Sequence, residues 1–163
     1  MTAAEVLLIR HAVAGDRDRW HRDDALRPLN RVGRRQARRL VESFADRPIA
    51  HLLSSPFVRC VQTLEPLAAE RGLPIETSDD LAEGRPWELV EKLAVELAND
   101  GPGALCVHGD VMEALIEDLR ERTIGQSVDA GGYAKGSTWI LGIRDGSIVS
   151  ARYVPEPDGA DAG

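Results

Sequence analysis

The 163-residue chain predicts a three-layer α/β/α sandwich with a mainly parallel sheet and an antiparallel hairpin at one edge. Short apolar runs typical of buried strands alternate with longer segments in which apolar residues recur every three or four positions. The dipeptide Asp145-Gly146 separates the last two apolar runs, and this is typical of a hairpin turn. The length suits one hydrophobic core. We therefore expect a single domain over residues 1–154 and a disordered polar tail over 155–163.

The strands are expected where four to eight residues form a short, mostly apolar run bounded by polar or turn residues. These runs cover residues 5–10, 50–54, 73–77, 104–107, 137–143 and 147–154.

The helices are expected between the strands, with local signals at their ends. Asn30 is a predicted N-cap for a helix that extends to about residue 46. Pro56 predicts the start of a second helix, which reaches Gly72 with a break at Pro66. A third helix carries one apolar face and ends at the turn residues 99–103. A fourth begins at Gly109, continues to about residue 123, and is followed by a Gly-rich connection.

The charge of the chain is unevenly distributed. The net charge is −7, but residues 10–47 contain eleven Arg against six acidic residues. A mostly acidic protein would repel a polyanion over most of its surface, which argues against general nucleic-acid binding. One basic region suits the attraction of a small anion.

The sequence also argues against a membrane protein, a secreted protein and a metal site. The longest aliphatic run has four residues, so no membrane span or membrane partner is expected. The N-terminus lacks a signal pattern, and we expect a cytoplasmic protein. The four histidines, at positions 11, 21, 51 and 108, have no paired metal-ligand spacing, so we expect neither a metal nor a cofactor.

Candidate functional residues follow three of the predicted strands. Arg10-His11 ends the first strand, Arg59 lies one helical turn beyond the second, and His108-Gly109 ends the fourth. In parallel α/β sheets these positions meet at one edge, where ligands bind. Two guanidinium groups can bind phosphoryl oxygens bidentately, and the amides of a helix beginning at Gly109 add further donors. The sequence therefore predicts a phosphoryl pocket.

Each of these residues also has a purely structural interpretation. Taken singly, an arginine at a strand end pairs with a surface carboxylate, and a helical arginine such as Arg59 is solvated. His11 could be a loop histidine bonded to the backbone, and His108 a core histidine. Their convergence at one sheet edge favours the functional interpretation. For Glu83, in an acidic turn after the third strand, catalysis and simple solvation stay open.

A histidine in such a pocket can act as a nucleophile. Near pH 7 a large fraction of its imidazole is neutral. Attack of the imidazole on phosphorus would give a phosphohistidine and divide the phosphoryl transfer into two in-line steps. Arg10, Arg59 and His108 would stabilise charge on the equatorial oxygens without a metal. Glu83 could protonate a leaving alkoxide.

The same residues carry a resemblance to a known family. Arg10-His11-Ala12 resembles the Arg-His-Gly signature of the histidine phosphatase superfamily, with Ala in the third place as in its SixA-type branch. Residues 27–33 and 54–63 resemble further blocks of that branch, and Val107-His108-Gly109 matches the segment with the second catalytic histidine. The resemblance implies a phosphoglycerate mutase-like fold, a nucleophile at His11 and phosphate contacts from Arg10, Arg59 and His108. It also implies a SixA-like phosphatase of phosphohistidine proteins.

A second resemblance points to other substrates. Residues 59–70 and 135–139 are similar to the phosphatase domain that follows a Nudix domain in actinobacterial MutT-type proteins. This resemblance implies nucleotides or other small phosphates as substrates. It suggests Lys135 as a substrate contact, although a solvated loop lysine is the simpler interpretation. In the arginine-rich loop 11–28 we retain only Arg27, which lies nearest the family block.

The leading hypothesis is a metal-independent phosphatase that forms a phosphohistidine on His11. Its expected partner is a phosphohistidine protein, and the alternative is a small phosphate ester or nucleotide. A non-catalytic phosphate-binding module is the rival from another class. A mutase is disfavoured because the chain has no insertion that could cap the pocket. We make no prediction of the oligomeric state.

Overall fold

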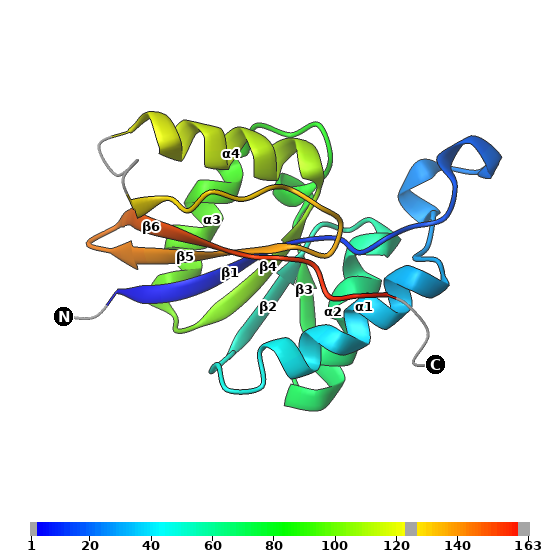
Figure 1. The fold of residues 1–163 in the computed structure, drawn as a ribbon, viewed down its shortest axis with the longest axis horizontal. Coiled ribbons are helices and arrows are strands. Elements are labelled where there is room, and N and C mark those ends of the chain that lie inside the picture. The colour runs from blue at the N-terminus through cyan, green and yellow to red at the C-terminus, as the bar shows by residue number, and fades with distance from the viewer. Residues whose placement is uncertain (1–2, 123–126, 160–163) are drawn as a thin grey trace.

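The computed structural model describes residues 3–122 and 127–159. A six-stranded sheet forms the centre of the molecule, in the order β3-β2-β4-β1-β5-β6 (Figure 1). Its strands are β1 (Ala4–Arg10), β2 (His51–Ser54), β3 (Ile75–Thr77), β4 (Gly103–Val107), β5 (Thr138–Arg144) and β6 (Ser147–Val154).

The sheet contains both parallel and antiparallel strand pairs, as predicted. Strands β3, β2, β4 and β1 run parallel to one another, whereas β5 pairs antiparallel with both β1 and β6. The hairpin turn between β5 and β6 is formed by Asp145 and Gly146, both at positive φ. Because this backbone matches the twist of paired strands, Asp-Gly is favoured there. The predicted fold class is confirmed.

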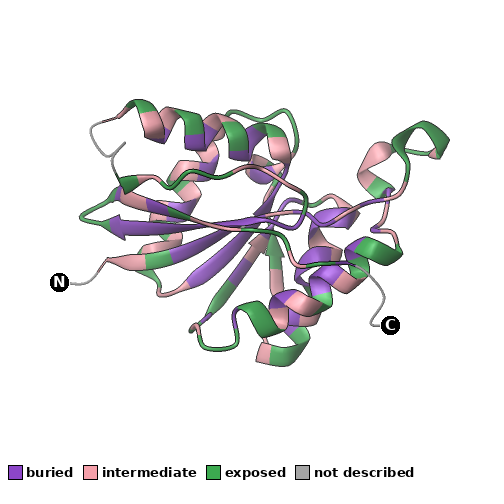
Figure 2. Ribbon diagram, viewed as in Figure 1, coloured by how far each residue is buried: buried purple, intermediate pink, exposed green. Residues whose placement is uncertain are grey.

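Two helices cover each face of the sheet. Helices α1 (Arg31–Ser43) and α2 (Val58–Arg71) lie on one face, and α3 (Trp87–Asn99) and α4 (Gly109–Glu121) lie on the other (Figure 1). The central strands are almost wholly buried between these layers (Figure 2). No helix within the described ranges is long and apolar enough to cross a membrane.

Strand β1 shows how the sequence builds the two layers. Its side chains alternate between faces, so Val6 and Leu8 join the core under α3 and α4, while Leu7 and Ile9 join the core under α1 and α2. Both faces are apolar, as expected for a strand covered on both sides.

Helix α2 differs from its prediction in two respects. It begins at Val58 rather than Pro56, and it continues through Pro66 without a break. Proline removes one backbone hydrogen bond from a helix interior. Leu64 and Leu67, on either side of Pro66, are both fully buried against the sheet, and this packing keeps the two halves aligned.

The end of the described chain makes contacts with helix α1. Residues 155–159 lie against α1, where the buried Gln36 donates to the Pro157 carbonyl and Arg35 donates to the Gly159 carbonyl. The disordered tail expected over residues 155–163 stays a prediction, and residues 160–163 lie outside the described part.

Two short 3₁₀ helices, Arg17–Arg19 and Asp24–Leu26, lie in the projecting segment between β1 and α1 (Figure 1).

Candidate active site

A polar cavity of about 600 Å³ opens at the carboxyl end of β1. It is bounded by the end of β1, the start of α4, the segment between β1 and α1, and the loop that precedes β5. The wall residues are Arg10, His11, Ala14, Gly15, Asp16, Arg17, Arg27, Glu83, Gly109, Asp110, Glu113, Tyr133 and Lys135.

His11 follows β1 directly and is 5% exposed. Its Nδ1 lies 2.8 Å from the carbonyl oxygen of Ala12. Because a carbonyl can only accept, Nδ1 carries the proton and the lone pair of a neutral ring is on Nε2. Burial lowers the pKa of His11 to about 3, and His108, Arg59 and Arg10 act in the same direction, against the Ala12 bond. The imidazole at the cavity wall is therefore neutral at pH 7 and has the protonation state of a nucleophile.

His108 is the N-cap residue of α4 and is fully buried. Its ring packs edge-on against His11, with 5.4 Å between ring centroids. Nε2 lies 2.9 Å from the hydroxyl oxygen of Ser55, at the end of β2. When the hydroxyl donates its proton to Nε2, the proton of the neutral ring is on Nδ1. In this tautomer Nδ1 of His108 is a hydrogen-bond donor.

Arg10 is the last residue of β1, and its guanidinium lies against the first residue of α4. Nη1 donates to the carbonyl oxygen of Tyr133. A Cβ atom added to Gly109 would lie only 2.5 Å from Cζ of Arg10. Burial lowers the pKa of the Arg10 guanidinium, and the carboxylates of Asp110 and Glu83 oppose this shift. A side chain at position 109 would therefore displace the Arg10 guanidinium from the helix N-terminus.

Arg59, in the first turn of α2, is fully buried. Nη1 donates to the backbone oxygen of Asp24 at 2.9 Å, and Nη2 lies 3.1 Å from the Asp24 carboxylate. Nη2 also lies 3.4 Å from the carboxylate of Glu83. The outer edge of this guanidinium is thus bound by two carboxylates from two different loops.

Three buried donors at the site have no hydrogen-bond partner among the described atoms. They are Nε of Arg10, Nε of Arg59 and Nδ1 of His108. An unpaired buried N–H costs about 1–3 kcal/mol, so such groups usually indicate a ligand or a strained site. All three belong to residues predicted as phosphate contacts. Arg10 lines the cavity beside His11, and the ring of His108 packs against the ring of His11.

The remaining predicted residues are brought to the same place. Glu83, Arg27 and Lys135 all line the cavity. Glu83 is partly exposed and pairs with Arg17 as well as Arg59. Arg27 is 5% exposed, and its side chain bonds to the carboxylate of Asp24 and to the Gly15 carbonyl.

The sequence reasoning missed the role of Asp24. Asp24 is one of several acidic residues in the arginine-rich loop, and in the structure its carboxylate contacts Arg59, Arg27 and Arg17. A local signal is present, because the Asp23 carboxylate accepts from the Ala25 amide and closes a turn that presents Asp24. Arg17, also set aside, lies on the cavity wall. The contact between Asp24 and Arg59 and the place of Arg17 on the cavity wall both depend on the tertiary structure. No spacing of residues in the sequence could predict either of them.

Within the described residues, no group of three or more His, Cys, Asp or Glu is placed to hold a metal ion.

Comparison with known proteins agrees with this geometry. The family model of the histidine phosphatase superfamily, branch 1, matches residues 6–91, which include His11, Arg59 and Glu83. The chain belongs to the histidine phosphatase superfamily. The predicted family resemblance is thereby confirmed.

One curated relative of this histidine phosphatase covers almost the whole chain. The 8-oxo-(d)GTP phosphatase of Mycolicibacterium smegmatis is 38% identical over 157 residues, which are 94% of this chain and 48% of that protein. The chain therefore spans about half the length of this relative.

Solved structures confirm the fold. A protein of Agrobacterium tumefaciens assigned as the phosphohistidine phosphatase SixA has a TM-score of 0.72 at 23% identity, over 96% of this chain and 99% of that one. A mycobacterial glucosyl-3-phosphoglycerate phosphatase has a TM-score of 0.68 at 18% identity, with the same coverage of both chains. At these identities the likeness concerns the fold.

Proposed function

We propose that the chain is a phosphatase that transfers a phosphoryl group to Nε2 of His11 and then to water. The observation that carries this proposal is the convergence of three unpartnered buried donors on a neutral histidine with Nδ1 bound to the backbone. In the first step, Nε2 forms a bond to phosphorus while the bond to the leaving oxygen breaks. In the second step, water attacks the phosphohistidine, and inorganic phosphate leaves.

The surrounding cations stabilise both transfers. Nε of Arg10, Nε of Arg59 and Nδ1 of His108 donate to the equatorial oxygens, where negative charge is concentrated in the transition state. The first amides of α4 add their dipoles at Gly109. These groups are held by β1, α2 and α4, so little reorganisation is needed when the substrate binds.

The position of Glu83 bears on the substrate. Its carboxylate lies at the cavity wall and 3.4 Å from Nη2 of Arg59. A phosphate ester leaves as an alkoxide, which needs a proton, whereas a phosphohistidine leaves as an imidazole. Glu83 in this place supports small phosphate esters or nucleotides as substrates, with the carboxyl group as general acid. The 38% identity to an 8-oxo-(d)GTP phosphatase supports the same class.

Protein phosphohistidine is the second candidate substrate. It is supported by the likeness to a SixA-type fold along the whole chain and by a cavity that no inserted domain covers in the described structure. On this alternative, Glu83 is not needed as an acid.

The test uses wild-type protein and two histidine variants, all in EDTA. Phosphate release is measured from p-nitrophenyl phosphate, a nucleotide and a phosphohistidine-bearing protein. We expect His11→Ala to lose activity by about 10⁴-fold or more. His51→Ala, which removes an exposed histidine from the other end of the sheet, is the matched control and should retain activity. Saturable phosphate binding by a folded wild-type protein without any release would establish the binding module instead.

A further inference from the structure

Lys135 lies on the cavity wall but takes no part in the phosphoryl chemistry described above. Among the described residues its ammonium group forms no ion pair, although carboxylates of Asp16, Asp110 and Glu113 line the same cavity. Two of these carboxylates are bound elsewhere: Asp16 pairs with Arg19, and Asp110 accepts from the Gly84 amide. An unpaired cation on a polar wall is available to a ligand.

The backbone around Lys135 is fixed to the nucleophile. The amide of Gly136 donates to the carbonyl oxygens of Arg10 and His11, at 3.2 and 3.0 Å. Gly136 has a φ of +87°, a conformation that most other residues would adopt only with strain. Lys135 itself is exposed, and this fixed backbone sets where its side chain begins.

A buried glutamine fixes the other side of this loop. Gln36 is 4% exposed; its Nε2 donates to the Lys135 carbonyl, and its Oε1 accepts from the amide of Val13. Lys135 is therefore held between the segment that follows His11 and helix α1. Its side chain starts from a position set by the active site itself.

The electrostatic surroundings agree with this placement. Burial lowers the pKa of Lys135, and the positive charges of Arg10, Arg27, Arg17 and Arg59 act in the same direction. Each of these arginines already has a protein partner, and Arg10, Arg17 and Arg27 line the same cavity as Lys135. An anion bound beside Lys135 would relieve this repulsion.

We infer that Lys135 binds a second phosphate of the substrate, so that the favoured substrates are phosphoanhydrides such as nucleoside diphosphates rather than simple monoesters. This inference rests on the proposed function. The three unpartnered donors at His11 bind the terminal phosphoryl group, and Lys135 binds the phosphate that leaves.

The chemistry balances without a general acid. Nε2 of His11 attacks the terminal phosphorus, and the bond to the bridging oxygen breaks with its electron pair remaining on that oxygen. The leaving group is then a phosphate monoester, a weak base whose added charge Lys135 neutralises. Water subsequently cleaves the phosphohistidine to inorganic phosphate, and its proton passes to solvent. Glu83 would be needed as an acid only when the leaving group is the alkoxide of a simple ester; in the structure both of its oxygens accept from arginines, Oε1 from Arg17 and Oε2 from Arg59.

The experiment measures kcat/KM for phosphate release from GDP, GMP, 3-phosphoglycerate and p-nitrophenyl phosphate in EDTA. We expect wild type to prefer GDP over GMP by at least about 10-fold, because one charge-assisted contact is typically equivalent to about 10- to 100-fold. Lys135→Ala should reduce activity on GDP at least about 10-fold more than activity on p-nitrophenyl phosphate. Lys135→Arg, which keeps the charge, should recover part of the preference.

The chain supplies a matched control in its other lysine. Lys92 is exposed on α3, away from the cavity, and Lys92→Ala should leave all four activities unchanged. Equal activity on GDP and GMP, or an equal loss on every substrate in Lys135→Ala, would overturn the inference. A preference for 3-phosphoglycerate would do so too, since the second anion would then be a carboxylate. Failure of wild type to hydrolyse any of the four compounds would instead count against the proposed function.

Discussion

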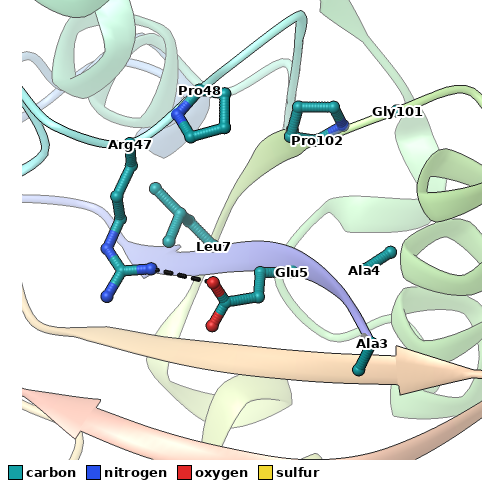
Figure 3. A pocket seen from close by; sticks show the side chains of 9 residues that line it. Ala3, Ala4, Glu5, Leu7, Arg47, Pro48, Gly101 and Pro102 are labelled. Atoms are coloured by element: carbon teal, nitrogen blue, oxygen red, sulfur yellow. Dashed lines mark hydrogen bonds and ion pairs between the residues drawn. The ribbon is translucent and has the colours of Figure 1, made fainter. Parts of the chain in front are cut away.

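The two ends of the sheet each carry a cavity and several arginines, but they differ in how their polar groups are paired. At the amino end, a cavity of about 290 Å³ lies between the start of β1 and the turn before β4 (Figure 3). Arg47 there donates to Glu5, whose second oxygen accepts from Arg152. At the carboxyl end, Arg10, Arg59 and His108 each retain a buried donor without a partner.

This difference follows from the direction of the strands. Parallel strands bring the first turns of helices and the loops after each strand to the carboxyl end, where backbone N–H groups point outward. The amino end receives helix C-termini and turns, and its charges neutralise one another. The presence of an arginine at a cavity therefore does not by itself indicate a ligand-binding site. An arginine whose buried N–H group has no hydrogen-bond partner does indicate one.

The largest expected contrast is between the arginines of the two ends. Arg59→Ala should lower kcat/KM by about 10³-fold, because it removes a preorganised donor from the phosphoryl group. Arg47→Ala should leave kcat/KM unchanged and alter the free energy of unfolding by less than about 1 kcal/mol, since its ion pair is partly exposed. Thermal melts verify that both variants fold. Equal effects of the two substitutions on kcat/KM would remove the distinction between the ends.

Glycines at the two ends give a second contrast. A Cβ at Gly109 would displace the Arg10 guanidinium, so Gly109→Ala should lower kcat/KM by about 10²-fold with little change in stability. A Cβ at Gly103 would lie 2.6 Å from Cδ2 of Leu97 and 3.0 Å from the His51 carbonyl oxygen. Gly103→Ala should therefore destabilise the fold by about 1–3 kcal/mol and leave the folded fraction active. Denaturant titration gives the free energy of unfolding of each variant, and assays of phosphate release give its kcat/KM. A Gly109→Ala variant with wild-type kcat/KM would show that displacement of Arg10 does not impair catalysis.

Histidines at the two ends give the smallest contrast, in the pH dependence of stability. His11 has its pKa lowered from 6.5 to about 3, so between these pH values the unfolded chain binds a proton that the folded protein does not. Stability contributed by neutral His11 is complete above pH 6.5 and decreases as pH falls, by about 1 kcal/mol per pH unit. Urea titrations from pH 7 to 5 should show a shallower decrease for His11→Asn than for wild type. His51→Asn, which leaves His11 in place, should keep the wild-type slope.

Much of the fold could be predicted from the sequence because its signals are local. Asn30 caps α1, Gly72 ends α2 at positive φ, and Asp145-Gly146 forms the hairpin turn. Each of these acts through its own backbone conformation or through neighbours within one turn. The continuous helix through Pro66 and the contacts of residues 155–159 with α1 could not be predicted, because packing against distant elements decides both.

The same division applies to the active site. The sequence by itself determined that Arg10, His11, Arg59 and His108 meet at one edge, since strand direction places the ends of parallel strands together. Only the tertiary structure decided that Asp24 binds Arg59, that the Ser55 hydroxyl contacts Nε2 of His108, and that Gln36 holds the Lys135 loop beside His11. Those contacts join residues 35, 53 and 99 positions apart, and such separations leave no periodic trace in a sequence. They depend on side chains that meet only after the sheet and its helices have packed.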